Sequence, residues 1–206
     1  MNRTKIDWPG LNYTWNPVIG CKSGCSYCYA RAWAKRAGRS FEPVFSEGQY
    51  RKPYKIKEPS KIFVCSLADL FGDWIPKEWI ERVLKVVKEN PQHTFMFLTK
   101  NPKRYSEFDF PKNCQLGMTI TGANTYKENA DILGMAYLKN YKFASIEPLL
   151  GMIDYPLNIF DLVIVGAMTG AGAIEPKKEW IDSIKHPNIF YKSNIKPFLA
   201  GKQKGH

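Results

Sequence analysis

The sequence lacks any apolar run of membrane-spanning length, and its first residues, MNRTKIDWPGLNYTWNP, lack the apolar core of a secretory signal. We therefore expect a cytoplasmic protein with no membrane partner. Internal repeats and low-complexity tracts are also missing, which argues against a solenoid. Cysteine is scarce, with five residues in the chain. An odd number of cysteines in a reducing compartment is a poor disulfide framework.

Acidic residues are outnumbered, with 19 Asp and Glu against 30 Lys and Arg, which gives a formal net charge of +11 and a pI of about 9.4. A charge of this size attracts polyanions, and nucleic acid is the first candidate partner. A proteome that is generally lysine-rich would produce the same composition with no binding role. The pI alone does not separate the two interpretations, because it does not locate the charge.

The length of 206 residues and the 44% hydrophobic content predict one globular domain, residues 1–206. Short apolar runs alternate with amphipathic stretches, which is typical of βα units and a parallel sheet. We expect strands at 13–15, 61–65, 94–98, 115–120, 143–146, 162–165 and 189–191, and helices at 29–38, 76–90, 125–139 and 177–184. Residues 39–60 read as a long irregular loop. The fold class is α/β, either a full or partial barrel or a doubly wound sheet.

Polar residues follow several of the expected strands. In both α/β architectures the active site lies at the carboxyl ends of the strands, so these side chains should meet. They are Ser66, Asp69, Thr99, Lys100, Thr121, Glu147, Gly166 and Thr169. Each also has a structural alternative: Ser66 as a helix cap, Asp69 as a partner of a lysine, and Glu147 as a brace for the turn at Pro148.

Three of the cysteines form a C-x3-C-x2-C loop, Cys21, Cys25 and Cys28, within GCKSGCSYCYA. Three thiolates on one short loop can each bind one iron of a [4Fe–4S] cluster and leave the fourth iron open. An open iron can chelate S-adenosylmethionine, whose reductive cleavage yields a 5′-deoxyadenosyl radical. A structural zinc with Cys65, Cys114 or His93 as fourth ligand is the alternative. Tyr27, before the third cysteine, could shield the cluster and lie near the adenine.

The cysteine loop in a βα context resembles the radical S-adenosylmethionine superfamily. The strings TWNPVIGC, CSYCYA, SLADLFG, LTKNP, SIEPLLG and IVGAMTGAGA resemble a family of small phage- and prokaryote-encoded members of unassigned function, from Trp15 to about Lys192. The resemblance implies a TIM-barrel-like partial (β/α)6 barrel. It also implies a [4Fe–4S] cluster and S-adenosylmethionine as cofactors, and an electron donor such as a flavodoxin or ferredoxin.

The resemblance further implies a role for several residues at the strand ends. Ser66 and Asp69 would approach the methionine amino group, where many relatives carry a Gly-Gly-Glu string that this chain lacks. Thr119 and Thr121 would lie near the ribose, and the loop from Gly166 through Thr169 to Gly170 would pass under the adenine or the carboxylate. Met168 stands where the family usually has an acidic residue, which leaves Glu147 as the main acidic group of the pocket.

Cys65 and Glu147 are the candidate catalytic residues. Cys65 ends a strand at the expected active face and could donate hydrogen, although a small buried side chain is the alternative for both Cys65 and Cys114. A basic aromatic segment, QYRKPYKIK, could hold phosphates and stack on bases. Its candidate nucleic-acid contacts are Tyr50, Arg51, Lys52, Tyr54, Lys55 and Lys57.

The sequence therefore predicts a radical S-adenosylmethionine enzyme that acts on a nucleic acid or a nucleotide-like substrate, with a protein partner to complete a substrate site built from short loops. Two alternatives stay open. One is a nucleic-acid-binding module stabilised by zinc or a cluster, with no catalysis. The other is the same radical chemistry directed at a peptide or a small metabolite.

Overall fold

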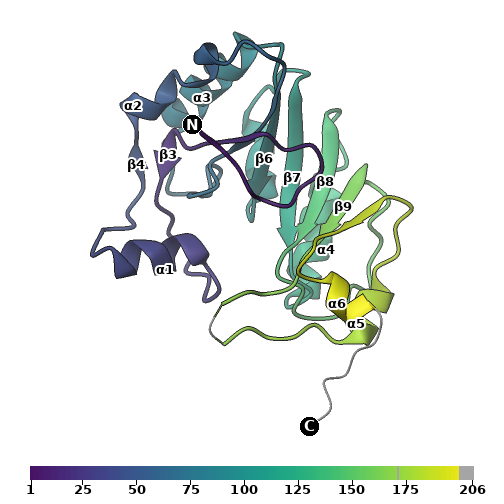
Figure 1. The fold of residues 1–206 in the computed structure, drawn as a ribbon. Helices are drawn as coiled ribbons and strands as arrows, with labels where there is room; N and C mark the ends of the chain where they lie inside the picture. The colour runs from purple at the N-terminus through teal and green to yellow at the C-terminus, as the bar shows by residue number, and fades with distance from the viewer. Residues whose placement is uncertain (171, 200–206) are drawn as a thin grey trace.

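An eight-stranded sheet forms the centre of the computed structural model, which describes residues 1–170 and 172–199 (Figure 1). The strand order is β1-β2-β5-β6-β7-β8-β9-β10. Strands β2 and β5 to β10 run parallel, and β1 pairs antiparallel with β2. The strands are β1 (Asn2–Arg3), β2 (Tyr13–Trp15), β5 (Lys61–Val64), β6 (Thr94–Thr99), β7 (Cys114–Ile120), β8 (Tyr141–Ile146), β9 (Leu162–Val165) and β10 (Ile189–Tyr191).

Helices and a small second sheet connect these strands. The helices are α1 (Tyr29–Arg36), α2 (Glu47–Tyr50), α3 (Lys77–Lys88), α4 (Thr125–Gly134), α5 (Lys178–Ser183) and α6 (Lys196–Leu199), with 3-10 turns at Pro53–Lys55 and Pro102–Glu107. The second sheet pairs β3 (Val18–Ile19) with β4 (Val44–Phe45) and leads into and out of α1. No helix in the described part of the chain is long and apolar enough to cross a bilayer.

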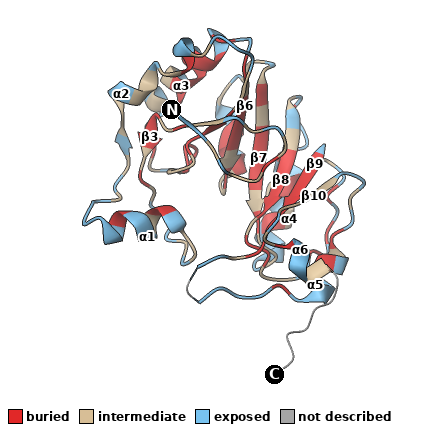
Figure 2. Cartoon of the chain, in the orientation of Figure 1, coloured by how far each residue is buried: buried red, intermediate tan, exposed pale blue. Residues whose placement is uncertain are grey.

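The two faces of the main sheet are covered differently, because successive side chains of a strand point to opposite faces. On one face, Val64 and Phe97 join a large core with Ile80 and Val83 of α3. On the other face the segment between β1 and β2 crosses the sheet (Figure 1) and brings in Trp8. Trp8 packs there with Phe63, Met96, Phe143, Leu162 and Ile164. Figure 2 shows the resulting burial of the central strands.

The strands and helices agree closely with the sequence-based expectations. All seven expected strands form, and the strand order never reverses, so the doubly wound alternative is wrong. Helix α4 ends at Gly134 instead of near Lys139, and the apolar side chain of Leu133 in its last turn is exposed. The expected irregular loop 39–60 contains β4, α2 and a 3-10 turn. These elements are too short for a periodic pattern to show in the sequence.

Candidate functional site

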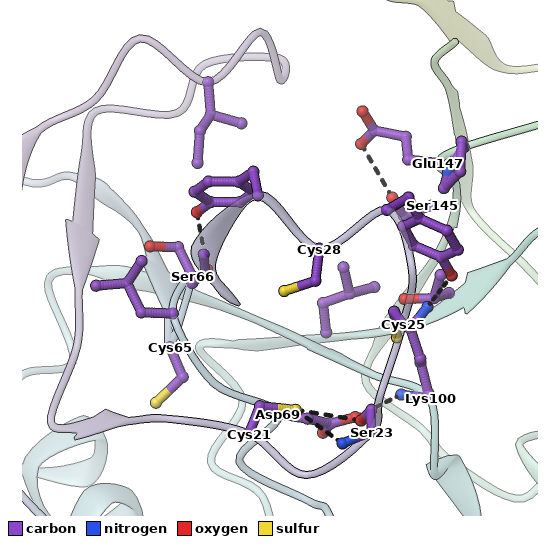
Figure 3. Close-up of a pocket in the computed structure, with 18 of the residues that line it drawn as sticks. Cys21, Ser23, Cys25, Cys28, Cys65, Ser66, Asp69, Lys100, Ser145 and Glu147 are labelled. Atoms are coloured by element: carbon purple, nitrogen blue, oxygen red, sulfur yellow. Dashed lines mark hydrogen bonds between the residues drawn. The ribbon is translucent and has the colours of Figure 1, made fainter. Parts of the chain in front are cut away.

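A pocket of about 340 Å³ lies at the carboxyl ends of the parallel strands (Figure 3). The three loop cysteines line it, together with residues that directly follow β5, β6, β8 and β9. The expected site residues found in the lining are Cys21, Cys25, Tyr27, Cys28, Cys65, Ser66, Asp69, Thr99, Lys100, Thr119, Glu147 and Thr169. The rule that polar residues meet at the carboxyl edge of a parallel sheet therefore located this pocket from the sequence.

The cysteine loop is fixed at both ends by main-chain contacts. At its start, the Gly20 N–H donates to the Leu67 carbonyl at 3.0 Å, and the Cys21 N–H donates to the Phe41 carbonyl at 3.0 Å. At its end, Cys28 is the N-cap of α1, and its sulfur accepts from the Arg31 N–H at 3.4 Å. The loop is therefore held between the sheet and the first turn of α1.

The three loop thiols line the pocket, and main-chain N–H groups contact two of them. Figure 3 shows their sulfur atoms on the inner side of the loop. Main-chain N–H groups reach two of them, Cys28 as above and Cys21, which accepts from Ser23 N–H at 3.4 Å. Such contacts stabilise ligating thiolates. Among the described residues no three Cys, His, Asp or Glu side chains converge enough to hold a metal ion. Binding would therefore require the thiols to turn toward a common centre.

Lys100 places a positive charge beside the cysteine loop. Its ammonium donates to the Tyr27 hydroxyl at 2.9 Å and lies 5.2 Å from the centre of the Tyr27 ring. Burial raises the pKa of the Cys25 thiol, and the nearby charge of Lys100 opposes that shift. Lys100 therefore favours the thiolate form that a metal ligand needs.

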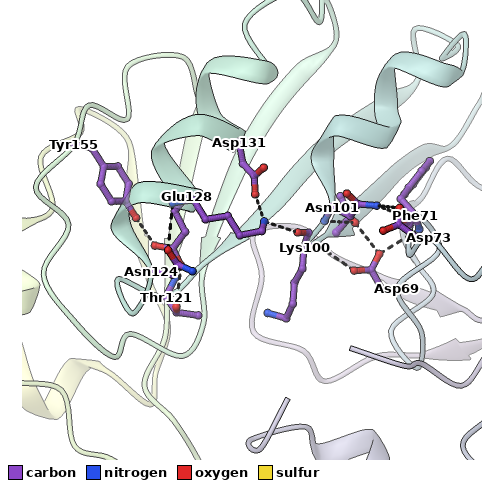
Figure 4. Close-up of polar contacts among 12 residues, drawn as sticks. Asp69, Phe71, Asp73, Lys100, Asn101, Thr121, Asn124, Glu128, Asp131 and Tyr155 are labelled. Carbon is purple, nitrogen blue, oxygen red and sulfur yellow. Dashed lines mark hydrogen bonds and ion pairs between the residues drawn. The ribbon is translucent and has the colours of Figure 1, made fainter. Parts of the chain in front are cut away.

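The Asp69 carboxylate binds the carboxyl end of β6 through hydrogen bonds (Figure 4). The carboxylate accepts from the Thr99 hydroxyl at 2.7 Å, the Lys100 N–H at 2.9 Å and the Phe71 N–H at 3.2 Å. Burial raises the pKa of Asp69, and these hydrogen bonds oppose the shift. The expected role near a methionine amino group competes with this structural role, because both oxygens already have protein partners.

Glu147 is the acidic group at the opposite wall of the pocket. It accepts from the Trp8 indole N–H at 2.8 Å and from the Ser145 hydroxyl at 3.1 Å, and it forms an ion pair with Lys192. A Cβ at Gly166 would lie 2.6 Å from Oε1 of Glu147, so only glycine leaves room for the carboxylate. Gly166 thus shapes the site without being among the lining residues.

Two other expected contacts have clear structural partners. The Ser66 hydroxyl contacts the Asn16 side chain at 3.2 Å, and the Ser66 carbonyl accepts from the Tyr29 hydroxyl at 2.8 Å. Thr121 lies outside the pocket lining. Its N–H and hydroxyl both donate to Glu128, at 2.8 and 2.9 Å, within a network that includes Tyr155 (Figure 4). Thr119 therefore lines the pocket, whereas Thr121 does not.

The remaining cysteines are both buried, but only Cys65 is near the loop. Cys65 lines the pocket in a left-handed conformation, with φ of 60°, and burial raises its pKa to about 12. Cys114 opens β7 and His93 precedes β6, at the amino ends of strands whose carboxyl ends face the pocket. About 16 Å of strand separates these ends. Neither residue can complete a metal site with the loop, so these two zinc alternatives are wrong.

The basic aromatic segment is not brought to the pocket. None of its residues lines the pocket. The segment packs instead near the C-terminal end of α3, where it forms a groove with Lys85 and Glu89. The Tyr54 hydroxyl donates to Glu89, and the Arg82 guanidinium lies 4.6 Å from the centre of the Tyr50 ring. Arg51 and Lys55 line this groove, and none of Arg51, Lys52, Lys55 and Lys57 lines the pocket with the cysteine loop.

The pocket lining also contains residues that were not expected from the sequence, among them Trp8, Ser145, Lys192 and Asn194. Lys192 and Asn194 follow β10 and could have been found by the same strand-end rule that found Glu147. Ser145 lies inside a strand, so no strand-end signal marked it. Trp8 comes from the irregular segment that crosses the sheet, and no local pattern indicates where such a segment goes.

Together the fold and the site define an α/β protein with a three-cysteine loop at the carboxyl edge of a parallel sheet. The chain belongs to the family described as a protein of unknown function, DUF5131, whose family model matches residues 3–203. Comparisons with curated proteins and with solved structures found no match.

Proposed function

We propose that this protein is a radical S-adenosylmethionine enzyme acting on a nucleic acid or a nucleotide-like substrate. Cys21, Cys25 and Cys28 would hold a [4Fe–4S] cluster, which supplies the electron that cleaves S-adenosylmethionine to the 5′-deoxyadenosyl radical. The observation that carries the proposal is the position of this three-cysteine loop over a pocket at the strand ends.

The sheet topology supports a partial barrel for this chemistry. Seven parallel strands follow one another in sequence order, which is the order of a (β/α) barrel and not of an open doubly wound sheet. No pairing joins β1 to β10 in the described residues, so the proposed barrel is open. The pocket lies where barrel enzymes bind their substrates.

The pocket also contains charges of both signs that suit a zwitterionic cofactor and an anionic substrate. On one wall, Trp8, Ser145 and Lys192 orient Glu147, which could accept from an ammonium group. On the other wall, Lys100 points toward the loop from beneath Tyr27. Phe63 and Leu98 supply apolar surface that would exclude water from the reacting atoms. A flavodoxin or ferredoxin would serve as the electron donor.

Anaerobic reconstitution tests the proposal. We expect about four irons per chain, a brown protein and, with dithionite and S-adenosylmethionine, release of 5′-deoxyadenosine. Cys25→Ser should abolish iron loading and product. Cys114→Ser is the matched control, since this buried thiol lies at the far end of β7, and it should retain both. A cluster-loaded protein that yields no 5′-deoxyadenosine contradicts the proposal.

A structural zinc is the second candidate, because Cys65 lines the same pocket as the three loop cysteines. Four cysteines would complete a tetrahedral site. Against it, burial raises the pKa of Cys65 to about 12, which disfavours the thiolate that zinc requires. Cys65→Ser separates the candidates. It should leave iron loading intact if the cluster proposal holds, and it should abolish metal binding if zinc is the native metal.

A further inference from the structure

The segment that contains the cysteine loop and α1 carries only positive charge. From Trp8 to Phe41 the sequence has no Asp or Glu, and the segment contains the cysteine loop and all of α1. Its cations are Lys22, Arg31, Lys35, Arg36 and Arg39. Lys35, Arg36 and Arg39 are exposed, and none of the three has an ion-pair partner among the described residues. An unpaired cluster of one sign on a helix that begins at the pocket attracts a ligand of the opposite sign.

Two large aromatic side chains are exposed in the same place. Tyr29 lines the pocket and is 62% exposed, and Trp33 lies one helical turn further along α1 and is 46% exposed. The buried side of α1 consists only of Ala30 and Ala34, as the two red bands on this helix in Figure 2 show. The Arg39 guanidinium lies 5.4 Å from the centre of the Trp33 ring. Rings and cations therefore alternate along one exposed surface.

We propose that this surface of Tyr29, Trp33, Lys35, Arg36 and Arg39, the α1 platform, binds single-stranded nucleic acid and directs one nucleotide into the pocket. Residues 29 and 33 are about 6 Å apart along the helix axis, a step that fits consecutive bases of an extended strand. Stacking requires unpaired bases, and a pocket of about 340 Å³ is too small to admit a duplex. Phosphates would meet the three cations.

The α1 platform fits this role better than the basic segment at residues 50–57. In that segment acidic residues lie beside the rings and cations, because the Tyr54 hydroxyl contacts Glu89 and because Glu47 and Glu58 lie close in sequence. The segment also packs against the C-terminal end of α3, away from the pocket. In the part of the chain that the structure describes, α1 combines exposed aromatic rings and unpaired cations with a position beside the pocket.

Fluorescence anisotropy with the metal-free full chain tests the proposal, using labelled single-stranded DNA and RNA of mixed sequence and about 12 nucleotides. We expect Trp33→Ala to weaken binding about 5- to 100-fold, and Trp33→Phe to retain most of it. Lys35→Ala/Arg36→Ala should reduce the slope of log K against log salt by about 1.4. Lys88→Ala/Lys112→Ala, two exposed lysines at the other end of the sheet, is the charge-matched control and should leave the slope nearly unchanged.

The proposal is overturned if the wild-type protein binds neither oligonucleotide at low salt, or if the control variant loses as much binding as the α1 variant. Binding to anionic phosphatidylserine vesicles that depends on α1, without oligonucleotide binding, would also overturn it in favour of a membrane surface. Only the reaction at the bound nucleotide depends on the proposed function; oligonucleotide binding by the α1 platform does not. Formation of 5′-deoxyadenosine without oligonucleotide binding refutes the α1 platform alone, and the reverse result refutes the radical activity alone.

Discussion

The five cysteines fall into two groups that differ in exposure. Cys21, Cys25 and Cys28 are partly exposed around the pocket, whereas Cys65 and Cys114 are buried. Iodoacetamide should therefore alkylate the loop cysteines of the folded metal-free protein well before the buried pair, because only accessible thiolates react. Peptide mass spectrometry gives the order of labelling. Cluster loading should protect the loop, and equal labelling of all five would contradict the assignment.

The buried thiols also set a pH dependence of stability. Burial raises the pKa of both Cys65 and Cys114 from 9.0 to about 12. Between these values the folded state keeps the protons that the unfolded state loses, so the free energy of unfolding must fall as pH rises above 9. Each thiol contributes at most about 1.4 kcal/mol per pH unit. Urea unfolding at increasing pH should show a shallower decline for Cys65→Ala/Cys114→Ala, and an unchanged slope would exclude this origin.

Glu147 and Lys192 form an ion pair in which both side chains are at most 20% exposed. Removing one partner leaves the other charge unpaired, so Glu147→Gln and Lys192→Met should each lower the free energy of unfolding by about 1–3 kcal/mol. The double variant should cost less than the sum of the two. The exposed pair Lys178–Asp182 is the control, and its cycle should give under about 1 kcal/mol. Strict additivity at Glu147 and Lys192 would show that they are uncoupled.

For single residues, the sequence predicted which side chains lie at the carboxyl edge of the sheet better than it predicted their hydrogen-bond partners. Glu147 and Thr169 were found because they follow strands, and the carboxyl ends of parallel strands share one edge. The same rule placed Thr121 at that edge without showing that Glu128 binds it from α4. A hydrogen-bond partner depends on which neighbour a side chain faces, and a pattern of strand ends contains no such information.

At the level of elements, the antiparallel pair of strands β3 and β4 positions the cysteine loop through a close backbone contact. Gly20 has φ of 98°, and a Cβ there would lie 2.2 Å from the Glu42 carbonyl oxygen. Gly20→Ala should therefore displace the loop, destabilise the protein by about 3 kcal/mol and abolish iron loading.

Gly38 provides the control for this prediction. It also has a positive φ, of 61°, but a Cβ there would meet nothing within 4 Å. Gly38→Ala should cost only about 1 kcal/mol and keep full iron loading, because it adds backbone strain without a clash. Urea unfolding and iron analysis of both variants measure the difference. Equal losses of stability and of iron loading in the two variants would mean that the β3–β4 pair does not determine the position of the cysteine loop.

The long elements were predictable because their apolar residues repeat with a clear period. Helix α3 has Ile80, Val83 and Val87 fully buried along one side, and β9 is buried at every position. The two-residue strands β3 and β4 are too short for any period, and their pairing joins Val18 to Phe45 and Ile19 to Val44, which lie far apart in the sequence. The sequence therefore predicted the main sheet and its helices but not the β3–β4 pair that flanks the cysteine loop.

At the scale of the whole molecule, the alternation of strands and helices predicted a parallel sheet but left its order open. The order became known only from the pairing of each strand with the next in sequence. The layer on the second face was also unexpected, because Trp8 lies in a segment with neither helical nor strand periodicity. It is buried by contacts with residues from β5, β6, β8 and β9 that the local sequence does not specify.

The crossing of this early segment determines when the pocket can be completed during synthesis. Trp8 bonds to Glu147, which is 139 residues away, and Asp7 accepts from the Ser193 N–H, which is 186 residues away. Contacts so distant in the chain close a large loop and form late in folding. A ribosome-bound chain whose β10 has not yet emerged therefore has its cysteine loop but lacks the contacts that complete the pocket wall. A cofactor that bound at that stage would bind an incomplete pocket.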